Sequence, residues 1–527
     1  MRCRASFRLG EPFKSMKPAL IRSLAVIAVG ATLGLLLSPL SGCSSKQSVL
    51  YQTFENLIGG ERGLPESAQK ELARFDAVFD VYLKKKQERA LQRDLFIEVY
   101  KHTRRNYVHP VDDAVLVDAA IKGMSEDWAK EGDDDETHNK AETAVEAALD
   151  AMLTSLDPHS GYLTPKEAEA MYANTRGQFG GLGISVTMRD QGVYVIAPIA
   201  DTPAERAGIK PGDIITHLNG KSLSGWTLMK AVNEMRGDPG TEISLTVKRK
   251  AQQPFSVSIV RDVIEIETVK ARLEGNIGYL QVTKFNEKVE DGVEAAIEDL
   301  YKQSQGRMTG LVLDLRNNPG GLLDQSVALS DAFLDKGRIV SIKGREGRGE
   351  RNYEAGIGDI AKGLPMVVLI NGGSASASEI VSSALQEHGR AVVMGRRSFG
   401  KGSVQTLLPL SNDGSLRLTT QLYYAPSGKT IQANGVAPDI ALVVKEPEDE
   451  KEKDEESKPR RESDYENALH DTAMAKTESK VKVEAESCKP VITTVAEEER
   501  KDYDLGCALS FLRMGSQASF LATVKTL

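Results

Sequence analysis

Several patterns that would assign a function at once are missing from this 527-residue chain. Its 67 Lys and Arg are outnumbered by 75 Asp and Glu, and the net charge of −8 argues against nucleic acid as a partner. Residues 372–376 read Gly-Gly-Ser-Ala-Ser, so the serine elbow G-x-S-x-G lacks its last glycine. Residues 395–401 approach the pattern of a phosphate-binding loop. However, Gly402 stands where that loop needs a magnesium-binding Ser or Thr, which excludes a nucleotide site.

Histidine and cysteine are both scarce. Of the seven histidines, the nearest to the serine cluster is His388, which follows Ser376 by 12 residues along one expected helix. At 1.5 Å per residue the separation is about 18 Å, too far for proton transfer. Of the four cysteines, Cys488 and Cys507 lie outside the first 43 residues. These two could pair in an oxidising compartment, and the sequence leaves that pairing open.

A strand–helix–strand unit surrounds the serine cluster. Residues 365–370 form an unbroken apolar run, which predicts a strand buried on both faces. The serines follow, then apolar residues at helical spacing over 380–385, and residues 391–394 predict a second buried strand. The strands of such a unit run parallel, so their carboxyl ends share one sheet edge. We therefore expect Ser376 and Lys401 to lie at the same edge.

A third loop is expected at that edge. Residues 310–315 predict another buried strand, and the glycine turn 316–321 follows it. Sites in open α/β sheets gather at the carboxyl ends of strands. Small serines alone are often a helix cap, and a lysine between glycines is usually a solvated loop residue. Their joint placement with the glycine turn favours a catalytic site instead.

A serine and a neutral lysine can together hydrolyse peptide bonds. The serine hydroxyl needs a base, and lysine serves only when its pKa falls from about 10.4 to roughly 7–8. Burial can supply the corresponding 3–4 kcal/mol or so. Gly400 and Gly402 would let the backbone press Lys401 into such a pocket, and Gln405 could hold the amine.

An oxyanion hole is the other requirement of this chemistry. We expect its backbone N–H donors at Gly320 or Gly321 and at Ala377, the expected helix start. The residues themselves do not choose the nucleophile among Ser374, Ser376 and Ser378.

These motifs together resemble the S41 serine peptidases, the carboxyl-terminal processing (tail-specific) proteases. The resemblance covers about residues 90–445, and it rests on the segments 156–163, 313–321, 374–379, 399–405 and 423–428. It implies Ser376 as nucleophile, Lys401 as base and Gln405 as the third member of a triad. It also implies an α/β (ClpP/crotonase-like) protease core and substrates that are protein carboxyl termini, often with small or apolar last residues. No cofactor and no metal are implied.

A small β-rich domain precedes the expected catalytic core. Frequent glycine turns separate short strands over residues 177–262, and 207–214 is the most specific part of a resemblance to bacterial PDZ domains. Its glycine loop can offer N–H groups to a terminal carboxylate, while the peptide joins the sheet edge. The peptide-binding residues implied are Gly180, Gly181, Leu182, Gly183 and Ile184. Arg261 resembles a regulatory residue that couples peptide binding to the active site.

The N-terminal segment predicts export. A basic start precedes an apolar stretch over residues 24–37, and 40–43 read Leu-Ser-Gly-Cys, which resembles a bacterial lipobox. Cys43 is then the lipidated amino terminus of a periplasmic protein. Because Ser44 follows it, the outer membrane is favoured over the inner by analogy. An uncleaved membrane anchor is the alternative.

The expected fold class is α/β multidomain. Two similar pieces of the tail, 464–469 and 502–509, predict small helices packed on the core. The expected domains are a lipoprotein signal peptide (1–42), a helical N-terminal domain (43–176), the PDZ domain (177–262), the S41 peptidase core (263–445), a charged linker (446–463) and a C-terminal tail (464–527).

The expected function is an exported, lipid-anchored serine endopeptidase that captures protein C-termini through its PDZ domain and cleaves near them. The alternative is a catalytically silent PDZ scaffold of the cell envelope. An envelope adaptor protein and a homodimer are further partners that the resemblance implies.

Overall fold

The computed structural model describes residues 64–82, 86–130, 140–189, 192–250, 252–444, 460–469, 478–479, 481–495 and 498–527. The expected signal peptide, Cys43, the acidic run 131–136 and most of the charged linker 446–463 lie outside these residues. Within the described ranges, no helix is both long and apolar enough to cross a membrane.

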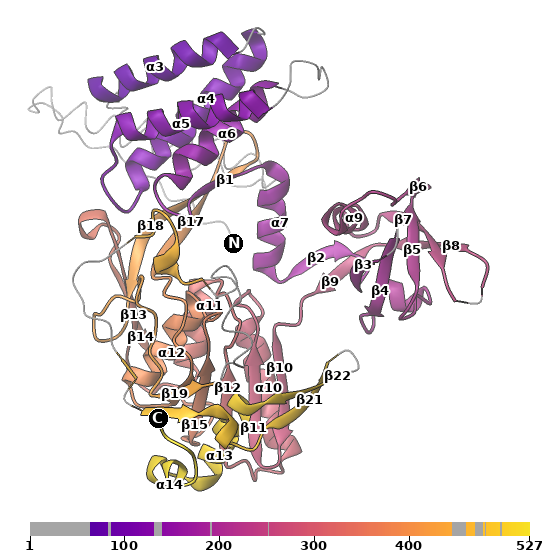
Figure 1. Ribbon diagram of the computed structural model, residues 1–527, viewed down its shortest axis with the longest axis vertical. Coiled ribbons are helices and arrows are strands. Elements are labelled where there is room, and N and C mark those ends of the chain that lie inside the picture. Colours follow the sequence, from indigo (N-terminus) through magenta and orange to yellow (C-terminus); the bar gives the residue numbers. More distant parts are fainter. Residues whose placement is uncertain are drawn as a thin grey trace, which may run out of the picture. The chain divides into compact units, whose positions relative to one another are not determined.

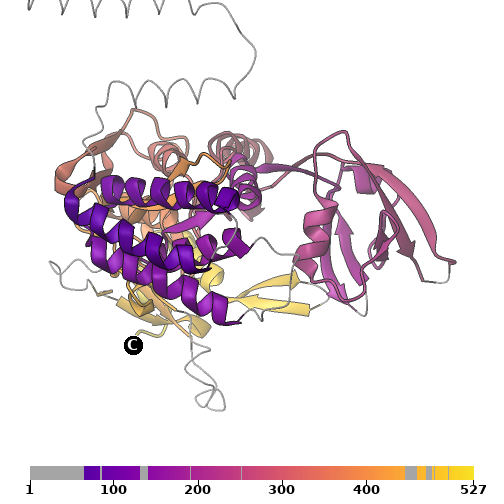
Figure 2. The ribbon, with the colours of Figure 1, turned by 90° about the horizontal axis from the view of Figure 1, so that it is seen from above.

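The described N-terminal region is helical, as the sequence predicts. Helices α3 (Glu66–Tyr82), α4 (Lys86–Asn106), α5 (Asp113–Lys130) and α6 (Lys140–Thr154) lie side by side in Figure 2. The Phe75 ring of α3 stacks on Phe96 of α4, with their centroids 3.7 Å apart. After α6 comes the short strand β1 (Gly161–Leu163) and then helix α7 (Pro165–Arg176), which ends at Gly177 with a φ of 72°.

The PDZ region is entered and left through a two-stranded ribbon. Strand β2 (Gln178–Gly181) pairs antiparallel with β9 (Asp262–Glu265). Between them lies an antiparallel sheet in the order β3 (Ile184–Arg189), β4 (Gly192–Pro198), β5 (Ile214–Leu218), β7 (Glu242–Lys248) and β8 (Phe255–Val260). Strand β6 (Lys221–Ser222) pairs with β5, and the helices are α8 (Pro203–Arg206) and α9 (Leu228–Met235). Within this sheet β3 is an edge strand.

The catalytic region is built on a seven-stranded sheet (Figure 1). Its order is β10 (Val269–Glu274), β11 (Ile277–Val282), β12 (Gly310–Asp314), β15 (Met366–Ile370), β16 (Val392–Gly395), β19 (Ile440–Val443) and β20 (Val481–Glu484). All neighbours from β11 to β20 pair parallel. The expected strands around the serines and lysine therefore form adjacent parallel strands, and the expected helix between them is α12 (Ala377–Glu387).

A five-stranded antiparallel sheet adjoins this core. Its strands are β1, β18 (Ser415–Tyr424), β13 (Gly337–Gly344), β14 (Arg351–Ala355) and β17 (Ser403–Pro409). Strand β18 pairs with β1, β13 and β17. Its last residues and β17, which follows Lys401, therefore bring a second sheet to the serine loop.

Both faces of the parallel sheet are covered. Leu311 and Leu313 pack with helices α10 (Val289–Gln303), α11 (Leu323–Asp331) and α12, whereas Val312 between them packs on the opposite side. The cover on that opposite side comes from the tail: β20 extends the sheet, and helices α13 (Tyr503–Met514) and α14 (Gln517–Leu521) pack against it. The chain thus forms a three-layer core whose third layer is its C-terminal segment.

One prediction for the tail is wrong. Residues 502–509 do lie in a helix that packs on the core, but 464–469 do not form one. There the chain makes a single 3₁₀ turn, Glu462–Asp464, followed by an irregular turn. Tertiary contacts of its charged and amide groups, rather than helical hydrogen bonds, hold this piece in place.

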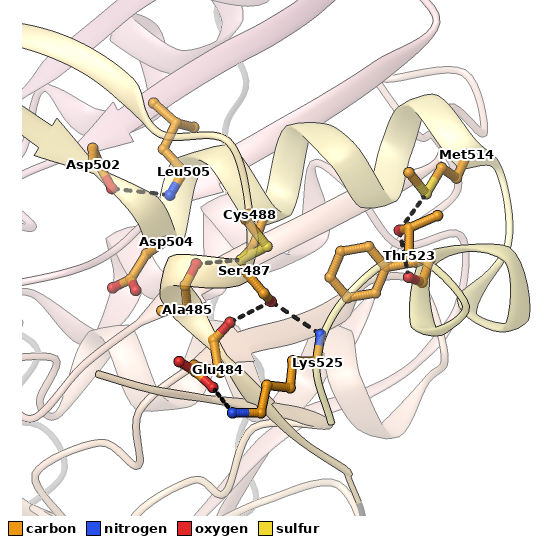
Figure 3. The surroundings of a disulfide bond; sticks show 12 residues. Glu484, Ala485, Ser487, Cys488, Asp502, Asp504, Leu505, Met514, Thr523 and Lys525 are labelled. Carbon is orange, nitrogen blue, oxygen red and sulfur yellow. Dashed lines mark hydrogen bonds and ion pairs between the residues drawn. A yellow bond between two sulfur atoms is a disulfide. The ribbon is translucent and has the colours of Figure 1, made fainter. Parts of the chain in front are cut away.

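A disulfide joins Cys488 to Cys507 within the third layer (Figure 3), with 5.1 Å between their Cα atoms. Both cysteines are buried. The bond ties the turn after β20 to α13, and the Lys525 ammonium binds the Glu484 carboxylate beside it. It therefore fastens the last 40 or so residues to the edge of the sheet.

Replacing both cysteines, Cys488→Ser with Cys507→Ser, should lower the stability of this layer by about 3 kcal/mol, because the unfolded chain regains the entropy of a closed loop of this length. Thermal unfolding with and without dithiothreitol measures it. The reductant should lower the Tm of the unmodified protein and leave the double variant unchanged. An equal response of both proteins would contradict a stabilising disulfide.

Candidate active site

Three loops meet at one edge of the parallel sheet, as the strand order requires. They follow β12, β15 and β16, which are neighbours in that order. The loop after β15 carries the serines, and the loop after β16 carries Lys401. The main chains of the serine and glycine loops touch, because the Ala375 N–H donates to the Asn318 carbonyl at 3.0 Å.

The three serines have different surroundings. Ser374 is buried, and its hydroxyl donates to the Leu315 carbonyl at 2.7 Å. Ser378 is also buried, and its hydroxyl donates to the Asn318 carbonyl at 2.9 Å. Ser376 alone of the three is partly exposed. The outer two serines therefore fasten the serine loop to the glycine loop, whereas Ser376 lies partly exposed between them.

Ser376 has an unusual backbone conformation. Its φ is 54° and its ψ −113°, at the residue immediately before α12. A residue with a Cβ atom pays of order 1–3 kcal/mol for such a backbone, and it keeps it only where the surroundings enforce it. The N–H of Ala377, the first residue of the helix, makes no hydrogen bond within the described part of the chain. The strained backbone of Ser376 is thus followed directly by the free N–H of Ala377 at the helix N-terminus.

A buried carboxylate, that of Glu379, connects the serine loop to the lysine loop. One oxygen accepts from the Ser376 N–H at 2.7 Å and from the Lys401 N–H at 2.9 Å. The other accepts from the Gly400 N–H at 2.7 Å and from the Ser398 hydroxyl at 2.6 Å. Burial raises the pKa of Glu379 to about 7, although these donors act to lower it. One carboxylate thus receives four donors and fixes the spacing of the two loops.

Tyr423 makes the matching connection on the carbonyl side. Its hydroxyl lies 3.2 Å from the Ser376 carbonyl and in very short contact with the Lys401 carbonyl. A single hydroxyl has one proton to donate, so the two carbonyls share it. Ser376 and Lys401 are therefore joined through both their N–H groups and their carbonyls. The structure places these two residues side by side, 25 positions apart in the sequence.

The amine of Lys401 has a lowered proton affinity. Burial lowers its pKa to about 8, and the nearby positive charge of Arg417 acts in the same direction. The carboxylates of Glu462, Asp157 and Glu379 act against the shift, Glu462 most strongly. A sizeable fraction of the amine is therefore neutral near physiological pH, as a general base requires.

Gln405 lies on β17 where the pairing with β18 shifts register, between Val404 and Gln405. Its amide nitrogen donates to the Ser403 hydroxyl at 3.0 Å and to the Thr419 hydroxyl at 3.2 Å. Among the described residues it makes no hydrogen bond to Lys401. The structure thus places Gln405 in the same sheet as the lysine loop without joining it to the amine.

The expected oxyanion donors are not equivalent. A side chain at Gly320 would lie within 2.8 Å of the Ser376 Cβ, so only glycine fits so close to the serine. However, the Gly320 N–H donates to the Asn318 side chain at 2.9 Å. Within the described ranges the N–H of Gly321 has no hydrogen-bond partner, like that of Ala377. Gly321 and Ala377 are therefore the better placed donors.

The expected peptide-binding residues span an entry strand and an edge strand. Gly180 and Gly181 belong to β2, Leu182 is buried, and Ile184 begins the edge strand β3. Gly183 has a φ of 75°, and its carbonyl accepts from the Ile199 N–H. The chain thus turns sharply just before an unpaired strand edge.

Arg261 lies at the C-terminal end of helix α9. Its guanidinium donates to the carbonyls of Glu234 and Met235, both at 3.0 Å, and so caps the C-terminus of α9. It also reaches the Thr241 hydroxyl. Arg261 therefore connects α9 to the strand by which the chain leaves the PDZ region.

The sequence reasoning gave no role to Glu379 or Tyr423. Glu379 stands three residues after Ser376, which is the spacing of a capping box, and that pattern could have identified it. Tyr423 belongs to a motif that contributed to the family resemblance, but nothing in the sequence aims its hydroxyl at the two loops. Among the described residues, no group of His, Cys, Asp or Glu side chains could hold a metal ion.

Comparison with known proteins identifies the family of the chain. Residues 276–442 match the model of peptidase family S41, and residues 180–259 match that of the PDZ domain. A carboxy-terminal-processing protease of Bartonella bacilliformis is 52% identical over 311 residues, which cover 59% of this chain and 71% of that protein. The chain belongs to the S41 peptidases. It is therefore a serine peptidase with a PDZ domain.

More distant relatives include a CtpA-like serine protease of Staphylococcus aureus (strain COL). It is 34% identical over 62% of this chain, and the aligned part is 64% of its own length. A solved structure of a photosystem II D1 C-terminal processing protease is 28% identical. The match covers 68% of this chain and 94% of that one, with a TM-score of 0.39.

Glu379→Ala should cut peptidase activity strongly, because three backbone N–H groups and the Ser398 hydroxyl lose their acceptor. Each unsatisfied buried donor costs about 1–3 kcal/mol, so the Tm should fall as well. Glu379→Gln, which keeps one acceptor oxygen, should retain more of both. Calorimetry and casein cleavage measure the two effects. The exposed Glu387, near the end of the same helix, supplies the control Glu387→Gln, which should preserve both. Full activity in Glu379→Ala would refute the spacing role of this carboxylate.

Proposed function

We propose that this S41 peptidase is an exported, lipid-anchored endopeptidase that binds protein carboxyl termini through its PDZ domain and cleaves by a Ser376–Lys401 mechanism. The observation that carries the mechanism is the double connection between these two residues through Glu379 and Tyr423. The lowered pKa of Lys401 supports it further.

In the proposed reaction the neutral Lys401 amine takes the proton of the Ser376 hydroxyl as its oxygen attacks the peptide carbonyl. The resulting oxyanion accepts from the N–H groups of Ala377 and Gly321. The Lys401 ammonium then returns its proton to the leaving amine, which frees the C-terminal fragment and leaves an acyl group on Ser376. A water molecule, deprotonated by Lys401, releases that group.

Substrate capture is proposed to use the edge of β3. An extended peptide can pair with this edge as an added strand while its carboxylate meets N–H groups of the turn at Leu182–Ile184. Arg261 would couple peptide binding in the PDZ region to the active site, because it holds α9 and the exit from the PDZ region together. Attachment through Cys43 to the outer membrane, an adaptor protein and a homodimer are parts of the proposal that rest on sequence resemblance.

Single alanine variants of the three serines test the nucleophile. Ser376→Ala should abolish casein cleavage, by on the order of 10⁴-fold or more, and Lys401→Ala should match it. Ser374→Ala and Ser378→Ala should fold less stably, since each gives up a buried hydrogen bond, yet remain active. Cleavage by the Ser376→Ala protein would disprove the assignment. Peptide binding without any cleavage by the unmodified protein would instead indicate a silent PDZ scaffold.

The pH profile tests the base. Because the active amine is neutral, activity should rise with pH through about 8, gaining roughly tenfold between pH 7 and 9. Below pH 7 the fall should be steeper than one proton explains, since Glu379, with a pKa of about 7, is then protonated too. Single-turnover hydrolysis of a short peptide isolates the chemical step. A rate independent of pH from 6 to 9 would exclude a lysine base.

A further inference from the structure

The segment 460–469, defined here as the brace, lies against the lysine loop. It contains a fully buried acid, Glu462, between Arg461 and Ser463. Acidic side chains are almost never fully buried unless they are paired. Its burial therefore requires specific partners, and each of them belongs to the surroundings of Lys401.

The brace holds the lysine loop on both sides of Lys401. Before it, the Glu462 N–H donates to the Phe399 carbonyl at 3.2 Å, and the Tyr465 ring packs on the Phe399 ring. After it, the Gly402 N–H donates to the Gln432 side-chain oxygen at 2.7 Å.

Gln432 links that second contact to the brace. Its amide nitrogen donates to the Glu462 carboxylate at 2.9 Å and to the Leu469 carbonyl at 3.1 Å. Gly402 packs so closely on Gln432 that a Cβ atom added to Gly402 would lie 2.5 Å from the backbone nitrogen of Gln432. Residues on both sides of the base are therefore fixed by contacts that lead to one residue of the brace, Glu462: its N–H on the Phe399 side, and its carboxylate through Gln432 on the Gly402 side.

The Glu462 carboxylate also binds His159. The Nε2 atom of His159 lies 2.9 and 2.8 Å from its two oxygens. His159 sits in a rigid turn, because Asp157 accepts its N–H and Arg417 binds its carbonyl. The brace thus joins the lysine loop to the turn that precedes β1.

Four charged groups act on the Lys401 amine. The carboxylates of Glu462, Asp157 and Glu379 favour its charged form, and Arg417 favours the neutral form. Glu379 and Tyr423 join the lysine loop to Ser376, but they do not contact the Phe399 carbonyl or the Gly402 N–H. Glu462 of the brace binds the first of these groups directly and the second through Gln432.

We infer that the brace is a positioning element of the active site: it holds the loop around Lys401 from both sides, and the Glu462 carboxylate is one of the charges that the amine experiences. Glu462 is a positioning residue, since it acts through Lys401. The inference rests on the proposed function, in which Lys401 is the base.

Three variants of the brace test this inference. Glu462→Gln removes the charge and keeps the size and one acceptor oxygen. Glu462→Ala also removes the hydrogen bonds of the carboxylate to His159 and Gln432, and it keeps the backbone bond to Phe399. Glu466→Gln is the matched control, because Glu466 is exposed on the same segment. The readouts are kcat, KM and the pH profile on a short peptide, with the Tm of each protein.

Glu462→Gln should move the rise of activity to lower pH, because a charge that favours the ammonium form is gone, and its rate at pH 9 should stay within a few-fold of the unmodified enzyme. Glu462→Ala should lose roughly tenfold to a hundredfold in kcat at every pH, because a loosened loop misplaces the base. Its KM should change little, since the proposed peptide-binding edge of β3 is untouched. Glu466→Gln should behave as the unmodified enzyme.

Arg417→Met keeps the test decisive if Glu462→Ala fails to fold. Loss of that positive charge should move the rise of activity to higher pH, opposite to Glu462→Gln. A Glu462→Gln profile that superimposes on the unmodified one, or shifts of both variants in the same direction, would overturn the inference. A lower Tm with an unchanged profile would show a merely structural brace. If Lys401→Ala stays active, the proposed function fails instead, which separates the two outcomes.

Discussion

The placement of one buried carboxylate is the constraint on which the site depends. Glu379 must accept N–H groups from the serine loop and from the lysine loop at once. Burying a carboxyl group is costly unless its oxygens are satisfied, so the two loops cannot separate without leaving it unpaired. The same contacts enforce the strained backbone of Ser376. The cost of the strain is thus offset by a group that is not itself expected to react.

The parallel sheet makes this arrangement possible. Adjacent strands β12, β15 and β16 end at one edge, and they remain straight and buried only because both faces are covered. The tail supplies one of those covers. Arg316, directly after β12, binds Asp502 at the start of α13 as well as Asp314, and Arg396, after β16, binds Asp504. Two of the three loops are therefore fastened to the third layer by ion pairs, of which those of Arg316 are largely buried and that of Arg396 is half-exposed. The site thus depends on a segment that lies far beyond the catalytic motifs in the sequence.

Much of the fold could be predicted from local pattern. Unbroken apolar runs identified β12, β15 and β16, and the strand–helix–strand connection between β15 and β16 predicted that these two run parallel. The third layer could not be predicted in this way, although strands that are apolar on both faces do require one. The likeness of 464–469 to 502–509 gave a helix that the structure does not have, and the buried Glu462 beside it binds residues far away in the sequence, His159 and Gln432. Local pattern likewise gave no sign that the Gln405 amide donates to the hydroxyls of Ser403 and Thr419 next to a register shift in β17.

By itself the sequence determined the family, the parallel strands, and a serine and a lysine at a common edge. These features follow from short-range patterns and from chain connectivity, which need no coordinates. Only the tertiary structure decided which of three serines is partly exposed, which glycine N–H is already engaged, and which charged groups raise or lower the proton affinity of Lys401. These depend on distances between residues that can be 303 positions apart, as His159 and Glu462 are. Such distances are set by the packing of whole layers, and no local pattern encodes them.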